Sequence, residues 1–192
     1  MTIPRAFVVL AVLAVVTGCA SLSEEQCLSG NWAGIGQSDG AAGLVAEAQF
    51  ARHVKACADT GITPDRAAWQ AGYARGLQSY CTPQKGLEEG LAGRRYRNPC
   101  PPASEPGFLR GYRIGADDHA ARQEVRKLES DIARLTSRNA QIVAALSAEN
   151  DATLRTELRN NRSEILRLQL ELGFARAEAA RSRRAVSEFR AG

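Results

Sequence analysis

The chain has 192 residues, with 25 basic and 21 acidic side chains and a formal net charge of +4 at pH 7. Because the charges are nearly balanced in both halves of the chain, the high pI does not come from one dense basic face, and no binding of nucleic acid is predicted. Two histidines are present, without a Gly-x-Ser-x-Gly or His-Glu-x-x-His motif. The sequence therefore indicates no catalytic residue, no metal site and no cofactor.

An apolar segment, residues 6–16, leads into Val16-Thr17-Gly18-Cys19. It is shorter than the roughly 20 residues that span a bilayer, so it predicts a signal peptide of residues 1–18. The four residues resemble the lipobox of bacterial lipoproteins, whose cysteine is acylated. The resemblance implies lipidation at Cys19, attachment to a membrane through its acyl chains, and a location in the bacterial envelope. Ala20 follows the cysteine, which implies the periplasmic face of the outer membrane.

Residues 19–38 are expected to form a tether and the entry to a helical domain of residues 39–116. The chain holds four cysteines besides Cys19, and none are spaced as Cys-x-x-Cys. Their even number in an exported chain predicts two disulfides. If the helices run up, down and up, Cys57 and Cys100 lie at one end of the domain and Cys81 lies at the other, where the segment with Cys27 enters. This arrangement favours Cys27 with Cys81 and Cys57 with Cys100, while the pairing of Cys27 with Cys57 and Cys81 with Cys100 stays open.

Proline and glycine signals predict four helices in the domain. The last of them has no stop signal at the domain edge. Their expected extents are Asp39 to Ala58, Asp65 to Tyr80, Thr82 to about Tyr96, and Glu105 onward.

Glycines recur in these helices as Gly-x-x-x-Gly pairs. A glycine inside a helix costs about 1 kcal/mol relative to alanine, so their number calls for a physical reason. Close approach of helix backbones supplies one, with neighbouring aromatic and leucine side chains filling the notches. The predicted helix-packing residues are Gly36, Gly40, Gly72, Gly76, Gly86, Gly90, Gly111 and Gly115.

A wider set of residues forms a recognisable pattern: Cys27, Trp32, Gly36, Asp39-Gly40, Gly43, His53, Cys57, Gly61, Pro64-Asp65, Trp69 to Gly76, Leu77, Tyr80-Cys81, Pro83, Gly86, Gly90, Gly93, Tyr96, Cys100 and Leu109 to Gly115. This pattern resembles the bacterial lipoproteins of domain of unknown function 2799, over about residues 27–116. The resemblance implies an envelope location, and it carries over no activity and no catalytic residue.

Residues 117–190 carry apolar side chains at alternating steps of three and four, which predicts a coiled coil. A polar break at residues 147–153 divides it into two seams. If the chain reverses there, facing residues have numbers that sum to 300, and the two asparagines in the seams, Asn139 and Asn161, meet as a polar layer. We favour this antiparallel hairpin over one continuous helix that would need partner chains. Asp117-Asp118-His119 is interpreted as a solvated first turn.

The predicted fold is all-α: a small glycine-rich, disulfide-stapled helical domain followed by a long coiled coil. We expect a non-catalytic envelope lipoprotein that acts as a structural or protein-interaction module. Its partners would be a second copy of the chain or an envelope protein. A peptidoglycan-associated tether and a periplasmic lipoprotein that binds a small ligand are the alternatives.

Overall fold

The computed structural model describes residues 21–192, so the predicted signal peptide and Cys19 lie outside the described residues. The described part is all-helical and contains no strand, as predicted. Within it, no helix has the length and apolar character that crossing a bilayer would need. The α-helices are α1 (Glu24–Ser29), α2 (Trp32–Ala41), α3 (Ala46–Ala56), α4 (Arg66–Tyr80), α5 (Pro83–Leu91), α6 (Glu105–Leu146) and α7 (Ala152–Ala191), with a short 3-10 helix η1 (Ala58–Thr60) after α3.

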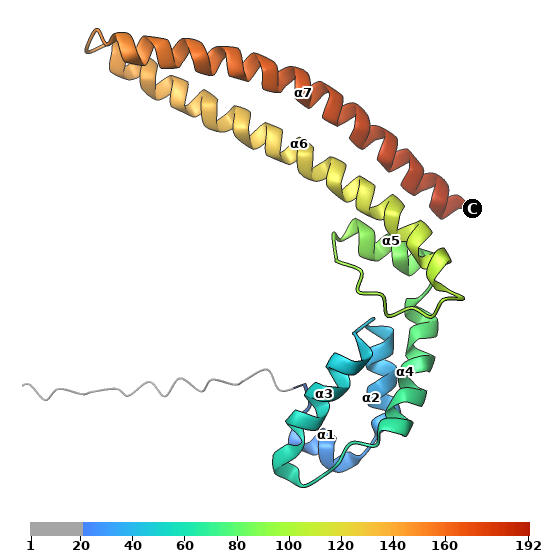
Figure 1. Ribbon diagram of the computed structural model, residues 1–192. Helices are drawn as coiled ribbons and strands as arrows, with labels where there is room; N and C mark the ends of the chain where they lie inside the picture. The colour runs from blue at the N-terminus through green and yellow to red at the C-terminus, as the bar shows by residue number, and fades with distance from the viewer. Residues whose placement is uncertain (1–20) are drawn as a thin grey trace, which may run out of the picture.

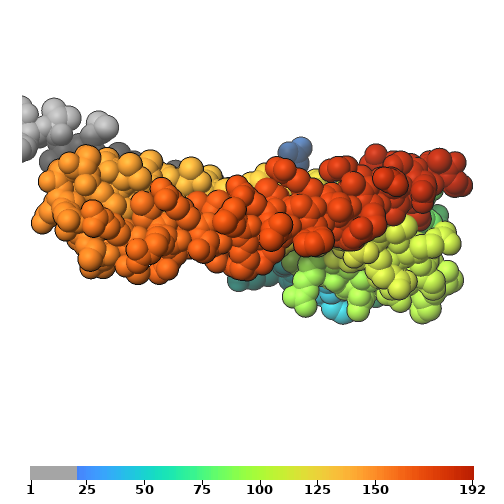
Figure 2. Space-filling model, turned by 90° about the horizontal axis from the view of Figure 1, so that it is seen from above, coloured from blue at the N-terminus to red at the C-terminus, as the bar shows by residue number. Residues whose placement is uncertain are grey.

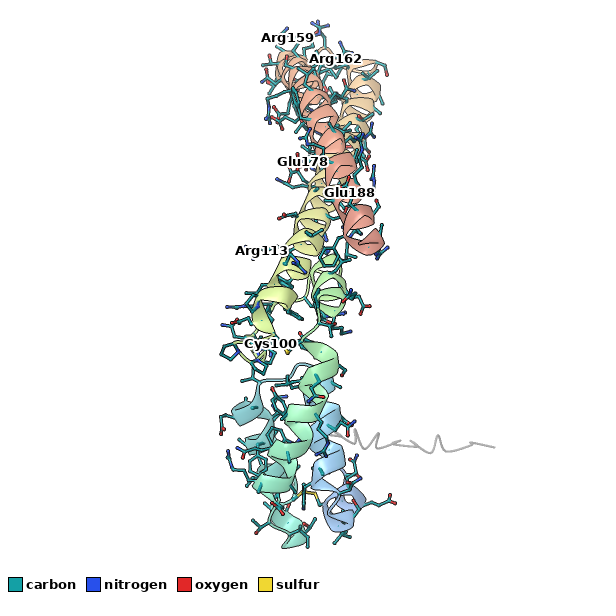
Figure 3. The ribbon with its side chains drawn as sticks, turned by 90° about the vertical axis from the view of Figure 1, so that its right-hand side faces the viewer. Cys100, Arg113, Arg159, Arg162, Glu178 and Glu188 are labelled. Atoms are coloured by element: carbon teal, nitrogen blue, oxygen red, sulfur yellow. A yellow bond between two sulfur atoms is a disulfide. The ribbon has the colours of Figure 1, made fainter. Side chains whose placement is uncertain are left out.

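The molecule is elongated and has three parts (Figure 1). Helices α1 to α4 form one end, α5 and the first turns of α6 form the middle, and the rest of α6 with α7 forms a curved hairpin. In the perpendicular view the hairpin tip and the α1 end lie at opposite extremes (Figure 3). The helical domain and the coiled coil share α6, which passes from one into the other without interruption.

Helices α2 and α4 pack backbone against backbone through their glycines. A methyl group at Gly36 would collide with the carbonyl oxygen of Trp69, and one at Gly40 with that of Tyr73. Gly72 and Gly76 of α4 stand equally close to backbone atoms of α2. Residue numbers rise together along both helices, so the pair is parallel. Only glycine permits this separation, which explains why the sequence tolerates its helix-weakening effect here.

The same arrangement recurs between α5 and α6. A methyl group at Gly86 would collide with the carbonyl oxygen of Phe108, and one at Gly90 with that of Tyr112. From the other side, Gly111 and Gly115 of α6 abut the backbone of α5. All eight predicted helix-packing glycines therefore lie at a helix crossing.

The two parallel pairs are copies of one structural unit. Gly36, Gly40 and Gly43 have the spacing of Gly86, Gly90 and Gly93, and Gly43 and Gly93 both adopt a left-handed φ, of 65° and 67°. In each unit a tyrosine of the second helix closes the turn after the first. The Tyr73 hydroxyl donates to the carbonyl of Leu44, and the Tyr112 hydroxyl donates to that of Arg94 at 2.9 Å.

Aromatic rings fill the interior of both units. Trp69 stacks on Tyr73 and contacts Phe50 in the first, with ring centroids 5.0 and 5.2 Å away. Phe108 fills the second and is fully buried. Tyr80, at the end of α4, stacks on Phe108 at 5.2 Å, so the two units share one continuous core.

The disulfides join cysteines that are neighbours along the chain, Cys27 with Cys57 and Cys81 with Cys100. All four predicted cysteines are bonded, but the favoured pairing of Cys27 with Cys81 and Cys57 with Cys100 is wrong. That pairing assumed one helix from Asp39 to Ala58 after a tether of residues 19–38, whereas three helices, α1, α2 and α3, precede Cys57 and most of α2 lies inside the expected tether. Because α3 runs back along α2, Cys57 returns to the end of the domain where α1 carries Cys27 (Figure 1).

The third predicted helix is also shorter than expected. Helix α5 ends at Leu91, not near Tyr96. The helix ends before Gly93, which has a left-handed φ. The segment after it is held by the hydroxyl of Tyr112, which donates to the carbonyl of Arg94 and lies 3.3 Å from the backbone nitrogen of Tyr96.

The coiled coil is the predicted antiparallel hairpin. Helix α6 ends at Leu146, and Asp151 begins α7 by accepting hydrogen bonds from the backbone nitrogens of Thr153 and Leu154. Leu128, Leu168 and Leu172 form a buried cluster in the seam. The chain thus reverses at the polar break without a proline or glycine, and an N-cap aspartate begins the returning helix.

Candidate functional site

A buried polar cluster lies in the first unit, centred on the carboxylate of Asp39. It accepts hydrogen bonds from Trp69 Nε1 at 2.8 Å and Gln49 Nε2 at 3.2 Å, and His53 Nε2 lies 2.7 Å away. His53 is 1% exposed and Asp39 is 8% exposed. The cluster joins α2, α3 and α4, so it fixes the three helices of the unit to one another.

His53 also contacts the segment before α1. Its Nδ1 lies 3.0 Å from the hydroxyl of Ser21. Since Nε2 faces the carboxylate, a neutral ring in this position would donate from Nε2 and accept a hydrogen bond from the Ser21 hydroxyl at Nδ1. Leu22 beside it is buried at 6% exposure. The chain is therefore held on the domain only two residues after Cys19.

Ser21, His53 and Asp39 follow the order of groups that activates a serine hydroxyl in hydrolases. A hollow of about 530 Å³ lies beside them, and its lining includes Asn31 and Ser38. The ring nitrogens are exchanged relative to the usual triad, because here Nδ1 faces the serine. The sequence analysis did not connect these residues, since hydrogen bonds between distant segments leave no periodic signal.

The second unit has an acid at the equivalent position, three residues after its first glycine. Glu89 is 8% exposed and accepts two hydrogen bonds from the guanidinium of Arg94, at 2.6 and 2.9 Å. These bonds lower the pKa of the Glu89 carboxyl, against the opposing effect of burial. Lys85 adds an ion pair at 3.4 Å. Each unit thus keeps a buried carboxylate beside its helix crossing, but the partners differ.

Asp117-Asp118-His119 does not form the solvated turn that the sequence suggested. Asp118 is 4% exposed, accepts from Arg122 Nε at 2.7 Å and accepts from the Ser182 hydroxyl at 3.1 Å. It therefore links α6 to α7. His119 turns the other way, with Nδ1 3.1 Å from the carbonyl oxygen of Leu91 and its ring against Gly93. The two side chains serve different contacts, and Asp117 is exposed.

The predicted polar layer is present in the hairpin. Asn161 Nδ2 donates to Asn139 Oδ1 at 3.0 Å. Ion pairs bracket the seam on the surface, between Arg138 and Glu157 and between Arg176 and Glu129. Among residues 21–192, no three His, Cys, Asp or Glu side chains converge in a way that would hold a metal ion.

The outer face of α7 carries large apolar side chains that the hairpin does not cover. Leu166, Leu170 and Phe174 are 63%, 70% and 77% exposed. We name these three residues the outer stripe. They lie one helical turn apart, on the side away from the buried seam residues Leu168 and Leu172, and Figure 2 looks down on the surface of α7. The sequence analysis assigned the seam and missed this second apolar face.

The architecture defines a class of small all-helical domains, built from two glycine-crossed parallel helix pairs and closed by two disulfides. Residues 31–117 match the model of a family described as "Protein of unknown function (DUF2799)", the family whose pattern the sequence resembles. The match covers both helix crossings and ends one residue beyond the domain edge predicted from sequence, at residue 117 instead of 116. No curated protein and no solved structure matches the chain.

Proposed function

We propose that this protein is a lipid-anchored envelope lipoprotein that acts as a non-catalytic protein-interaction module. The observation that carries the proposal is the outer stripe. The seam of the hairpin is already filled by Leu128, Leu168 and Leu172. The outer stripe is therefore not needed to hold the hairpin together. Exposure of three large apolar side chains to water is unfavourable and promotes aggregation unless a partner covers them.

The spacing of the stripe indicates the shape of that partner. Leu166, Leu170 and Phe174 follow one another at four-residue steps along a helix, which suits a second helix packed alongside. Gly173 lies within the same stretch, and nothing stands within 4 Å of the place where its side chain would be. A neighbouring helix could approach closely there. A second copy of α7 or a helix of another envelope protein fits this surface.

The packing of the chain just after Cys19 supports the proposed lipid anchor. Ser21 and Leu22 are packed on the first unit, so acyl chains on Cys19 would hold that unit at the membrane surface. Figure 3 labels Arg159 and Arg162 near the opposite extreme of the molecule. The hairpin would extend away from the membrane and present the stripe to proteins of the periplasm.

A photocrosslinking amino acid placed at residue 170 in the native envelope tests the interaction. Gln169 is the matched control, because it is exposed on the same helix about 100° away. We expect an adduct from position 170 and none from position 169. The adduct from position 170 should disappear when Leu166→Gln and Phe174→Gln are introduced together. Its mass separates a second copy from another protein.

Equal adducts from positions 169 and 170, or none from position 170, would reject the stripe as an interaction surface. The anchor has its own test, because metabolic labelling with a palmitate analogue should mark the wild type and not Cys19→Ser. Labelling of both to the same extent would end the lipoprotein part of the proposal. A pull-down on purified peptidoglycan separates the interaction module from the tether.

A second candidate function, hydrolysis through Ser21, is favoured by its hydrogen-bonded chain to His53 and Asp39. A fluorophosphonate probe reacts with serine hydroxyls that a neighbouring base activates. Labelling of the wild type that is absent in Ser21→Ala and in His53→Gln would support this function. An unlabelled wild type would reject it and leave the cluster as a structural brace between α2, α3 and the segment before α1.

A further inference from the structure

A groove at the base of the hairpin is lined by residues of α5, of the early turns of α6 and of the end of α7. Figure 2 shows these segments side by side. Its larger part has a volume of about 850 Å³ and is lined by residues that include Leu91, Arg122, Arg183, Val186 and Arg190. A smaller hollow of about 400 Å³ adjoins it, since Arg122 and Arg183 line both. Arg126 and Arg176 complete the smaller hollow.

The groove and the adjoining hollow are lined by five arginines and by two carboxylates, Asp118 and Glu88, so the positive charges are only partly balanced. Arg122 pairs with Asp118, and Arg176 pairs with Glu129. Within residues 21–192, no carboxylate lies within ion-pair distance of the other three groove arginines, Arg126, Arg183 and Arg190. Like charges that share one groove raise one another's electrostatic energy, and a bound anion would lower it.

We propose that this groove is a binding site for clustered phosphate groups. Guanidinium groups recognise phosphate through paired hydrogen bonds, which makes arginine better suited than lysine to this task. The floor of the groove adds apolar surface from Leu91, Ala92 and Val186. A ligand with several phosphate oxygens and an adjacent apolar part, such as a phospholipid headgroup, would use both features. A free pyrophosphate would use the arginines alone.

The site does not depend on the proposed interaction function. The outer stripe faces away from the hairpin, whereas the groove lies between α7 and the helical domain. The groove also draws on both regions of the chain, because α5 belongs to the family-matched domain and α7 does not. Loss of one property would therefore leave the other measurable.

The test uses the chain from Ala20 to Gly192, which contains every described residue. Binding of inorganic pyrophosphate is measured by calorimetry, and binding of lipid by co-sedimentation with cardiolipin or phosphatidylcholine vesicles. The groove variant is Arg183→Gln with Arg190→Gln. The control variant is Arg159→Gln with Arg162→Gln, which removes the same charge near the hairpin tip, far from the groove (Figure 3).

We expect the wild type and the control variant to bind pyrophosphate or cardiolipin with equal affinity, and the groove variant to bind at least about tenfold more weakly. Binding to cardiolipin alone identifies a lipid headgroup as the source of the phosphate, and binding to pyrophosphate alone identifies a soluble ligand. Circular dichroism confirms that both variants fold. Equal weakening in the two variants would show that only net charge matters and would overturn the site. Absence of binding to both ligands by the wild type would overturn it as well.

Discussion

Asn139 and Asn161 face each other across the hairpin, with Asn161 Nδ2 donating to Asn139 Oδ1 at 3.0 Å. Both side chains are half-buried in a seam that is otherwise apolar. Polar residues at such positions commonly fix the register of a coiled coil at some cost in stability. The amide pair therefore accounts for the alignment of α6 with α7 better than for the strength of their packing.

Replacing one asparagine should be worse than replacing both. Asn161→Leu leaves the Asn139 amide without its partner and should lower the free energy of unfolding by about 1 kcal/mol. The double variant with Asn139→Leu exchanges two amides for an apolar contact and should match or exceed the wild type. Urea unfolding measures both. Asn160→Leu, on the exposed side of α7, is the control and should change little; a larger loss in the double variant than in the single would contradict this account.

The glycine crossings predict a sharp contrast between two helical glycines. Gly72→Ala places a methyl group against the backbone carbonyl of Ala33 and should destabilise the protein by about 3 kcal/mol or more, because backbone cannot move aside. Gly173→Ala meets nothing within 4 Å and should stabilise α7 by up to about 1 kcal/mol. Thermal unfolding compares them. Similar melting temperatures for the two variants would disprove the backbone contact between α2 and α4.

The disulfide connectivity can be determined by peptide mapping without reduction. Trypsin cleaves after basic residues between all four cysteines, so each cysteine falls on its own peptide. Mass spectrometry without reduction should find Cys27 linked to Cys57 and Cys81 linked to Cys100. Removing either bond should lower stability by about 3 to 4 kcal/mol in the chain-entropy model. Any peptide linking Cys27 to Cys81 would contradict the structure.

Glu89 predicts a stability that depends on pH. Hydrogen bonds from Arg94 lower the pKa of its carboxyl below the value of 4.5 expected in the unfolded chain. The contribution of Glu89 to the free energy of unfolding is therefore complete above about pH 4.5. It is lost as the pH falls through the lower pKa of the folded state.

Glu89→Gln should lower the free energy of unfolding by about 1 kcal/mol at pH 7, a modest value because Arg94 is largely exposed. The difference from wild type should shrink in acid. Glu88→Gln is the matched control, since its carboxylate is exposed and, among the residues that the structure describes, pairs with Lys85 alone. Denaturant titrations at pH 7 and pH 3 decide the matter, and a constant difference between the two pH values would count against the ion pair.

The hairpin could be predicted from sequence because the apolar spacing, the polar break at residues 147–153 and the two facing asparagines all indicate the same register. The rule that facing residues sum to 300 even continues past the predicted seam, to Ala121 with Ala179 and Asp118 with Ser182. Those pairs were missed because small and polar side chains give no apolar signal. Helix α4 and the start of α6 were also predicted, since proline and an N-cap residue mark their beginnings.

The contacts of the first unit were harder to predict. The turn between α2 and α3 contains no proline, and its single left-handed residue, Gly43, lay inside the helix predicted from Asp39 to Ala58. Missing that turn reversed the expected direction of the chain before Cys57, and the wrong disulfide pairing followed. The cluster around Asp39 joins residues from three helices, and only the folded arrangement brings them together.

The sequential disulfides bear on the order in which the domain can form. A chain that crosses a membrane from its N-terminus delivers Cys27 and Cys57 before Cys81 and Cys100. Each cysteine then meets its own partner first, so oxidation in order of emergence gives the native bonds without isomerisation. Under the proposed export, the first unit, with its parallel helix pair, would close before the hairpin has crossed the membrane. Each later segment would then be added to a unit that is already held by a disulfide.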